Sequence, residues 1–185
     1  MKQRVVILSL TVAIMTLMNA CHAGDTSSGA AGTNASANSQ AKAAATPTAD
    51  EIRAVLAAHD KALNDKNLDA LMATFSSDPS TVVLGTGAEE RWKGPQEIRA
   101  AYTEIFKDYD PGTLVTDCTQ WKTGGADEAG TMAWLAATCN CKDSLKGKPR
   151  DYKMNVSGTV EKQNNKWVFV SLHMSNAFEP PPVAK

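Results

Sequence analysis

The chain has 185 residues, of which 21% are charged and 43% hydrophobic, and its formal net charge is −1 at pH 7. This nearly neutral balance, with no long basic run, excludes a nucleic-acid-binding surface built on lysine and arginine. The length suits one folded domain with extensions, and the sequence has no internal repeats.

The N-terminus has the pattern of an export signal. Lys2 and Arg4 precede an apolar run over residues 5–18, and small residues follow it. The run is too short to cross a bilayer as a helix, which needs roughly 20 apolar residues. The sequence MNAC at residues 18–21 resembles a bacterial lipobox, so we expect residues 1–20 to be removed and Cys21 to be lipidated. Cleavage after Ala23 is the alternative, and it would give a soluble periplasmic or secreted protein.

Two segments outside the folded domain are predicted from composition. Residues 21–47 are rich in Ala, Ser, Thr and Gly with almost no apolar bulk, which is typical of a disordered tether. Residues 179–185 form a proline-rich tail. The folding unit is therefore expected over residues 48–178, held at the periplasmic side of a bacterial membrane only through the lipid anchor.

Three helices are predicted in the first half of this domain. Thr48 and Glu51 form a capping-box signature, and apolar residues then recur at helical spacing as far as residue 63. A short second helix has its apolar residues on one face between residues 68 and 75. The third helix opens at Gly94-Pro95, with proline at a tolerated first position, and carries an apolar stripe that includes Tyr102.

Strands dominate the second half. Residues 81–84 form a short strand between the second and third helices, and from residue 112 onward the apolar period changes to two. Four longer strands are predicted over residues 113–122, 131–141, 151–161 and 166–178. A tight hairpin turn at residues 163–165 joins the last two. Helices followed by a run of antiparallel strands indicate an α+β domain.

The three cysteines of the domain leave their pairing open. Cys118 could bond to Cys139 or Cys141 in an oxidising compartment. A regular hairpin between the predicted strands, however, places Cys118 opposite about Leu135. Cys139 would then lie roughly 13 Å along the strand, at about 3.4 Å per residue. A disulfide would need a bulge or another strand arrangement, and zinc is disfavoured because no second Cys/His cluster has ligand spacing.

Three motifs together resemble the SnoaL-like group of the nuclear transport factor 2-like superfamily. They are ALNDKNLDALMATF at residues 62–75 with Asp78 after it, WKGPQEI at 92–98 and WVFVSLHMS at 167–175. The resemblance covers residues 49–178. It implies a cone-shaped fold in which three N-terminal helices pack on a curved, mostly antiparallel sheet, with a pocket between them and often a dimer through the outer face of the sheet.

This superfamily includes ketosteroid isomerases, polyketide cyclases, dehydratases and members without chemistry, so the site must decide the function. An isomerase of this kind has a carboxylate base on the first strand, and residues 81–85 contain no Asp or Glu. Asp78 is interpreted as a turn residue. His59 matches the position of an oxyanion-type donor and Tyr102 that of a supporting pocket tyrosine. We favour a hydrogen-bonded core histidine for His59 and leave both interpretations open for Tyr102, and a His59–Asp117 dyad is not required by the spacing.

The remaining site residues follow from strand alternation. We expect the pocket to be lined by His59, Tyr102, Trp92, Trp134, Met154 and Met174. On the last strand the even-numbered residues from 168 to 174 are all apolar and are expected to face the helices. Trp167, Phe169 and His173 then face outward as candidate dimer-interface residues, although a bulge would invert this register.

The sequence contains no Ser-His-Asp arrangement, phosphate-binding glycine loop or metal motif, and no cofactor is expected. We favour a cell-envelope domain that binds a small apolar or amphipathic ligand, or acts as a homodimeric scaffold, without catalysis. The alternative is an enzyme of cyclase, isomerase or dehydratase type that uses His59 as its acid/base. A module that binds a protein partner through the Trp167, Phe169 and His173 face is a third possibility.

Overall fold

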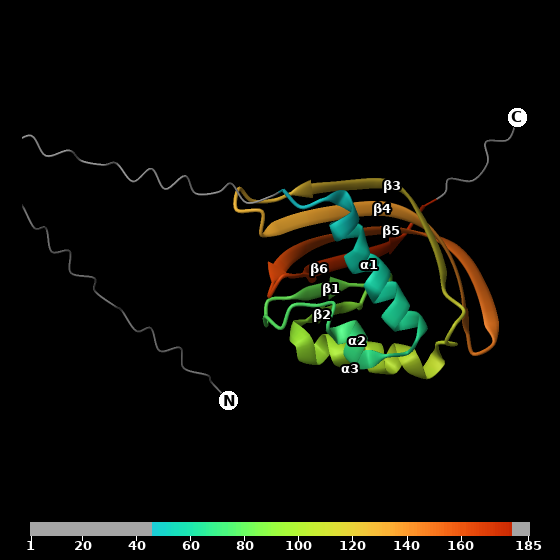
Figure 1. Cartoon of the computed structure of the whole chain (residues 1–185). Coiled ribbons are helices and arrows are strands. Elements are labelled where there is room, and N and C mark those ends of the chain that lie inside the picture. Colours follow the sequence, from blue (N-terminus) through green and yellow to red (C-terminus); the bar gives the residue numbers. More distant parts are fainter. Residues whose placement is uncertain (1–45, 179–185) are drawn as a thin grey trace, which may run out of the picture. The chain divides into compact units, whose positions relative to one another are not determined.

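The computed structural model describes residues 46–178. In chain order the elements are α1 (Ala49–Asn64), α2 (Leu68–Met72), β1 (Val82–Leu84), β2 (Arg91–Lys93), α3 (Gly94–Asp108), β3 (Val115–Gly125), β4 (Met132–Leu145), β5 (Lys148–Gln163) and β6 (Lys166–Asn176) (Figure 1). The predicted signal peptide, the Cys21 anchor, nearly all of the tether and the C-terminal tail lie outside the described residues. Within residues 46–178 no helix is long and apolar enough to cross a membrane.

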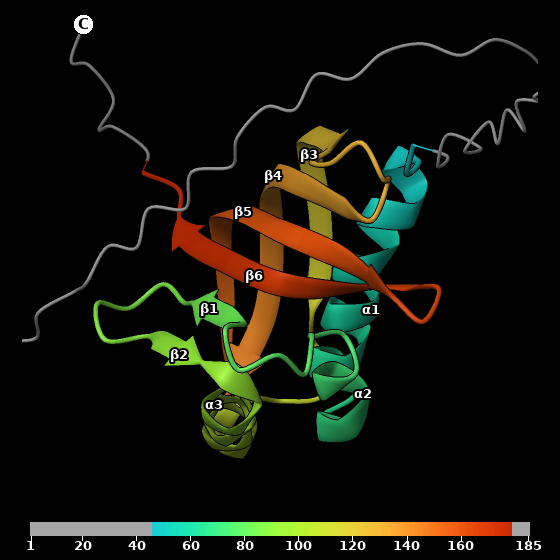
Figure 2. The same ribbon diagram turned by 90° about the vertical axis from the view of Figure 1, so that its left-hand side faces the viewer.

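The six strands form one mixed sheet in the order β2-β1-β6-β5-β4-β3. All neighbouring strands are antiparallel except β1 and β6, which are parallel. The long strands β3, β4 and β5 curl around the helices (Figures 1 and 2). Helix α1 packs against β3, β4 and β6, and α3 packs against β1 and β2. The expectation of three helices on a curved sheet is therefore met in part, because α2 has only five residues and two strands separate it from α3.

The helices begin where local signals predict. The Thr48 side chain accepts from the Glu51 backbone N–H, and the Glu51 carboxylate accepts from the Thr48 backbone N–H, so the capping box is confirmed. Pro95 lies in the first turn of α3. Burial of the apolar stripes joins both helices to one core, whose fully buried members include Ile52, Leu71, Ile98, Leu135, Phe169 and Leu172.

Two-residue turns close the long hairpins. Asn164 and Asn165, with φ of 49° and 62°, join β5 to β6 as predicted. Lys146 and Gly147, with φ of 51° and 72°, join β4 to β5. This second turn was not predicted, and it extends β4 four residues beyond the expected end at Cys141.

The predicted register between β3 and β4 is wrong. Cys118 lies directly opposite Cys139, and the two form a disulfide. Strand β3 continues to Gly125 instead of ending near Lys122, so every earlier residue pairs further along β4. The pairing of Lys122 with Ala136 would place Cys118 opposite Asn140, and the bulge between Thr119 and Lys122 moves its partner back by one residue to Cys139.

The outward assignment of Phe169 is also wrong. A bulge in β6 opposite Thr159 and Val160 leaves Phe169 fully buried in the core. Beyond the bulge the expected alternation holds, with Leu172 buried and His173 exposed. Trp167 is only partly exposed, because it packs against the core and the Lys162 ammonium lies 5.6 Å from its ring centroid. The three residues therefore do not share one outer surface.

Candidate functional site

A cavity of about 330 Å³ lies between α1, α3, the β1–β2 region and the inner face of β4, β5 and β6. Five of the six predicted pocket residues line it: His59, Tyr102, Trp92, Met154 and Met174. Its volume is at the lower end of the range for small-molecule sites in proteins. The helix stripes and the strand alternation therefore bring these distant residues into one place.

Trp134, the sixth predicted pocket residue, lies elsewhere. Its side chain is on the outward face of β4 and is 40% exposed. The ring covers Gly124, its partner on β3, so closely that a Cβ atom on that glycine would come within 2.9 Å of it. Even-numbered residues of β4 point away from the helices, and Trp134 follows that alternation.

His59 is held by hydrogen bonds at both ring nitrogens. Its Nδ1 lies 3.1 Å from Asp60 Oδ1, and its Nε2 lies 2.8 Å from the Tyr102 hydroxyl. The side chain is 2% exposed, and the rings of Phe75 and Phe169 meet it edge-on. An ionised carboxylate only accepts hydrogen bonds, so in the neutral ring Nδ1 donates to Asp60 and Nε2 accepts from Tyr102. Asp60 thus takes the place considered for Asp117, which is exposed on β3.

Asp60, His59 and Tyr102 form a hydrogen-bonded series that can hold a proton in a fixed position. Burial, with the nearby Asp60 charge as a smaller cause, raises the pKa of Tyr102 far above its usual value, so its phenol stays protonated at neutral pH. Both ring nitrogens of His59 are occupied by these hydrogen bonds, so a substrate could exchange a proton with His59 only by replacing one of them. His59 therefore matches a satisfied core histidine at the edge of the cavity.

A second polar cluster lies at the β4–β5 hairpin and was not predicted. The Arg150 guanidinium binds both oxygens of Asp143, with Nε–Oδ1 at 2.7 Å and Nη2–Oδ2 at 2.6 Å. Tyr152 donates its hydroxyl to Asp143 Oδ2 at 2.9 Å, and the Arg150 guanidinium lies over the Tyr152 ring. Burial and the Asp143 charge raise the pKa of Tyr152, and the hydrogen bonds to Asp143 raise that of Arg150. Asp143 was missed because the predicted strand ended at Cys141.

All three tyrosines of the chain, Tyr102, Tyr109 and Tyr152, line this cavity. Tyr109 is 3% exposed, and among residues 46–178 its hydroxyl has no hydrogen-bond partner of ordinary geometry. Burial and the Asp143 charge raise the pKa of Tyr109 to about 12, an effect that the nearby Thr113 hydroxyl partly offsets. A buried hydroxyl without a partner is costly, and it is a group that a ligand could satisfy.

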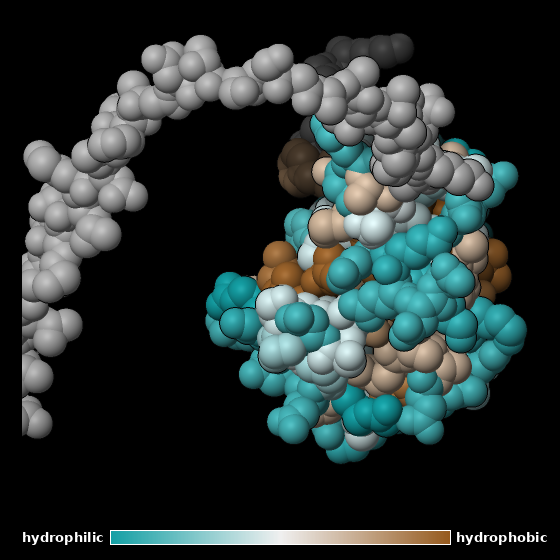
Figure 3. All heavy atoms as spheres, turned by 60° about the vertical axis from the view of Figure 1, so that its left-hand side comes forward, coloured by the Kyte–Doolittle hydropathy of each residue, from teal (hydrophilic) through white to brown (hydrophobic). Residues whose placement is uncertain are grey.

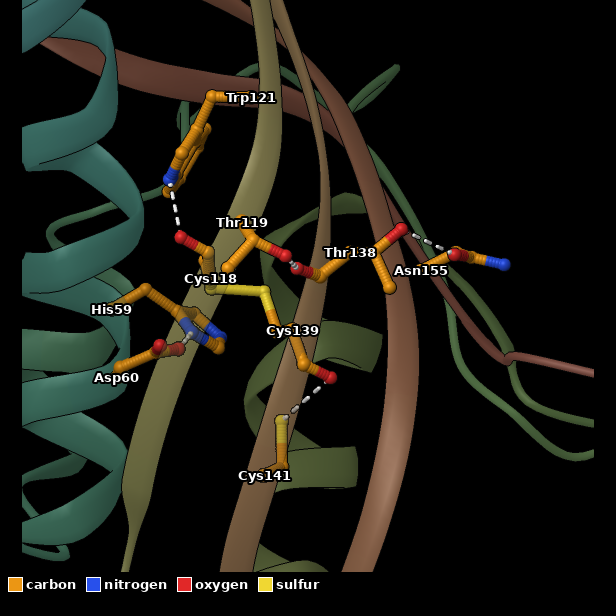
Figure 4. The surroundings of a disulfide bond; sticks show 9 residues. All are labelled: His59, Asp60, Cys118, Thr119, Trp121, Thr138, Cys139, Cys141 and Asn155. Carbon is orange, nitrogen blue, oxygen red and sulfur yellow. Dashed lines mark hydrogen bonds and ion pairs between the residues drawn. A yellow bond between two sulfur atoms is a disulfide. The ribbon is translucent and has the colours of Figure 1, made fainter.

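The disulfide lies beside this site. Figure 4 shows Cys118–Cys139 joining β3 to β4 next to His59 and Asp60 of α1, with Cys141 two residues further along β4. Cys141 is a buried free thiol that lines the cavity, and burial raises its pKa to about 11. A thiol in this state is a poor nucleophile, so Cys141 contributes packing to the site.

A larger and more open groove of about 560 Å³ runs between α1 and β3. Its walls include Arg53, whose guanidinium stacks 5.3 Å from the Trp121 ring centroid. Asp60, Leu114 and Thr116 line both this groove and the cavity, so these three side chains separate the two spaces. The groove is open to solvent and contains no convergent buried polar groups, and we therefore place the candidate site in the cavity.

Comparisons with known proteins agree on the fold. The family model of the SnoaL-like domain matches residues 52–179. Comparison with curated protein sequences gives no match. A protein of unknown function with a cystatin-like fold from Nostoc punctiforme PCC 73102 is 18% identical with a TM-score of 0.59, over 74% of this chain and 98% of that one. An NTF2-like protein of unknown function from Pseudomonas putida KT2440 is 18% identical with a TM-score of 0.57, over 74% and 93%.

A ketosteroid isomerase-like protein from Erwinia carotovora atroseptica SCRI1043 is 16% identical to this chain, with a TM-score of 0.57 over 70% of this chain and 96% of that one. Identities this low show the fold alone. The domain has the nuclear transport factor 2-like fold, with a mixed and curved six-stranded sheet.

Proposed function

Since the chain belongs to the SnoaL-like domain family, whose fold serves both enzymes and proteins without chemistry, we propose that it is a non-catalytic ligand-binding domain. The cavity would hold one small amphipathic molecule against Trp92, Met154 and Met174. The observation that carries this proposal is that both ring nitrogens of His59 are already hydrogen-bonded inside the protein. No Asp or Glu lies on β1, where an isomerase of this family would place its base.

We further propose that the domain works outside the cytoplasm as a lipoprotein. The Cys118–Cys139 disulfide supports an oxidising compartment, in agreement with the export signal in the sequence. Lipidation of Cys21 remains the expected anchor.

We also propose a homodimer through the outer face of the sheet, with interface residues that differ in part from those expected from the sequence. Exposed residues of that face include Trp134 and His173, while Phe169 is buried and cannot take part. On the face shown in Figure 3, hydrophilic residues cover most of the described domain and hydrophobic ones form separate patches. On the outer sheet face, Trp134 is paired with Thr159 and His173 with Ser157, so a dimer built there would be polar around Trp134.

The second candidate is an acid–base enzyme of the isomerase, cyclase or dehydratase type. It is favoured by the connected groups Asp60, His59 and Tyr102, which could transfer a proton if a substrate replaced one of their hydrogen bonds. Replacing His59 with Ala would separate the two functions. An enzyme would lose turnover. In a binding domain, the binding free energy of the ligand would fall by no more than the contribution of one hydrogen bond, about 0.5–1.5 kcal/mol.

Binding of a neutral apolar probe tests the leading proposal. We expect N-phenyl-1-naphthylamine to bind the full chain at one site with increased emission. Met174→Trp should abolish binding by filling the cavity, and Met132→Trp, on β4 outside the cavity lining, should leave it intact. Equal binding by both variants, or no binding by the wild type, would contradict the proposal.

A further inference from the structure

The cavity lining carries more negative than positive side chains. Its carboxylates are Asp60, Glu90, Glu104, Asp108 and Asp143, and Arg150 is its Lys or Arg residue. Arg150 is bound through two nitrogens to Asp143, so its charge is already offset. An anionic ligand would therefore meet no free cationic partner among the lining residues, and it would face several carboxylates.

Two of these carboxylates have no Lys or Arg partner among the described residues. Glu104 is paired with Lys107 at 2.7 Å, and Asp108 is paired with Lys146 at 2.8 Å. Among the described residues, the polar partner of Asp60 is the His59 ring, and Glu90 forms no ion pair. The free negative charge of the cavity is thus concentrated at Asp60 and Glu90.

The position of the Glu90 carboxylate depends on Gly85 and Gly87. It is half-buried between the exposed Glu89 and Arg91, and its Oε2 accepts from the Gly87 backbone N–H at 2.8 Å. A Cβ atom on Gly85 would lie 2.3 Å from Oε2, so the carboxylate can lie across this segment only because residue 85 has no side chain. Glu90 Oε1 has no hydrogen-bond partner within the described residues.

The Trp92 ring lies on the same side of the chain as this carboxylate. Trp92 follows Glu90 by two residues, a spacing that directs both side chains to one face of an extended segment, and both line the cavity. Tyr109, which follows the other end of α3, lines the same cavity with a buried hydroxyl that has no partner among the described residues. A carboxylate beside aromatic faces is the environment that protein sites use for ammonium groups, through charge attraction and cation–π contact. Met154 and Met174 leave the rest of the space apolar.

We propose that the ligand of this cavity is a small hydrophobic amine, bound in its protonated form with the ammonium at Glu90 and Trp92. This assignment rests on the proposed ligand-binding function and names the chemical class of its ligand. The apolar part of the ligand lies against the two methionines. Asp60 adds long-range attraction from α1.

Three probes of matched shape test the charge preference in the full chain at pH 7 and low salt: 4-phenylbutylamine, 4-phenylbutanol and 4-phenylbutanoate. Titration calorimetry should give the amine an affinity at least about tenfold above the alcohol, with the carboxylate weakest. Glu90→Gln should remove most of the advantage of the amine over the alcohol. Glu89→Gln makes the same charge change on an exposed neighbour outside the cavity and should have no such effect.

Gly85→Ala provides a second variant, because it displaces the Glu90 carboxylate without removing it, and it should also weaken amine binding selectively. The inference is overturned if the alcohol or the carboxylate binds as tightly as the amine, or if Glu90→Gln and Glu89→Gln behave alike. In those cases the alcohol still binds, and the proposed binding function stands. Failure of all three probes to bind overturns both.

Discussion

The hydrogen bond between Tyr102 and His59 makes a sharp prediction about stability. Tyr102→Phe removes the hydroxyl that lies 2.8 Å from His59 Nε2 and leaves this buried nitrogen without a partner. An unsatisfied buried polar group costs about 1–3 kcal/mol, so the free energy of unfolding should fall by about 2 kcal/mol.

Tyr109→Phe is the matched control. It makes the same chemical change at the residue that follows α3 and lines the same cavity, but its hydroxyl has no partner among the described residues. Removal of an unpaired buried hydroxyl should leave the ligand-free protein unchanged or stabilise it by up to about 1 kcal/mol.

Urea unfolding followed by tryptophan fluorescence measures both variants. With a slope of about 1–3 kcal/mol per molar urea, the midpoint of Tyr102→Phe should fall by roughly 1 M with an unchanged slope. The reasoning is refuted if the two variants shift the midpoint equally, or if Tyr109→Phe is the more destabilised one.

Three further predictions follow from the same contacts. Because the pKa values of Tyr102, Tyr109 and Tyr152 are all raised by burial, absorbance at 295 nm should record almost no tyrosinate in the folded protein at pH 10–11. The stability that these shifts contribute is present below the unfolded pKa of 10 and is lost as the pH rises through the folded pKa values, and the folded pKa of Tyr109 is about 12. Unfolding should therefore become easier above pH 10. Normal titration of all three tyrosines would contradict their burial around the cavity. Replacing both Cys118 and Cys139 with Ala should lower the free energy of unfolding by about 3 kcal/mol, as a loop of this length predicts, and a non-reducing peptide map should find these two cysteines linked and Cys141 free. Gly158→Ala should cost about 1–3 kcal/mol in thermal or urea unfolding, because its Cβ would lie 2.8 Å from the Ser171 carbonyl oxygen and 3.0 Å from the Phe169 ring; a neutral result would refute the close packing at the β6 bulge.

Local signals in the sequence were sufficient to predict the helices and the direction of their buried faces. The capping box at Thr48 and Glu51 and the proline in the first turn of α3 each act within a few residues, and they set where the helices begin. Helical periodicity likewise pointed His59 and Tyr102 inward, although it could not reveal that they bind each other across 43 residues of sequence.

Strand ends and bulges could not be obtained in the same way. A two-residue turn at Lys146 and Gly147 extends β4, and this extension brings Asp143 into the cavity. The bulge that buries Phe169 adds one residue to β6, and nothing in an alternating apolar run marks which residue is extra. Register depends on the whole pair of strands, so an error of a few residues at one end of β3 misplaced the partner of Cys118.

The carboxylates around the cavity were missed for a related reason. Asp60 follows His59 directly, and adjacent residues of a helix do not share a face, so the apolar stripe that includes His59 gave no reason to select it. Glu90 precedes β2 in a loop whose position depends on contacts distant in sequence. Both are visible as parts of the site only when the sheet and helices are assembled.

Native mass spectrometry of the protein purified gently from the envelope of its own cells tests most directly the claim that the cavity is a ligand site. The account predicts one small molecule per chain in the wild type and none in Met174→Trp prepared in the same way. An empty wild-type protein, or the same ligand retained by the filled variant, would contradict the account.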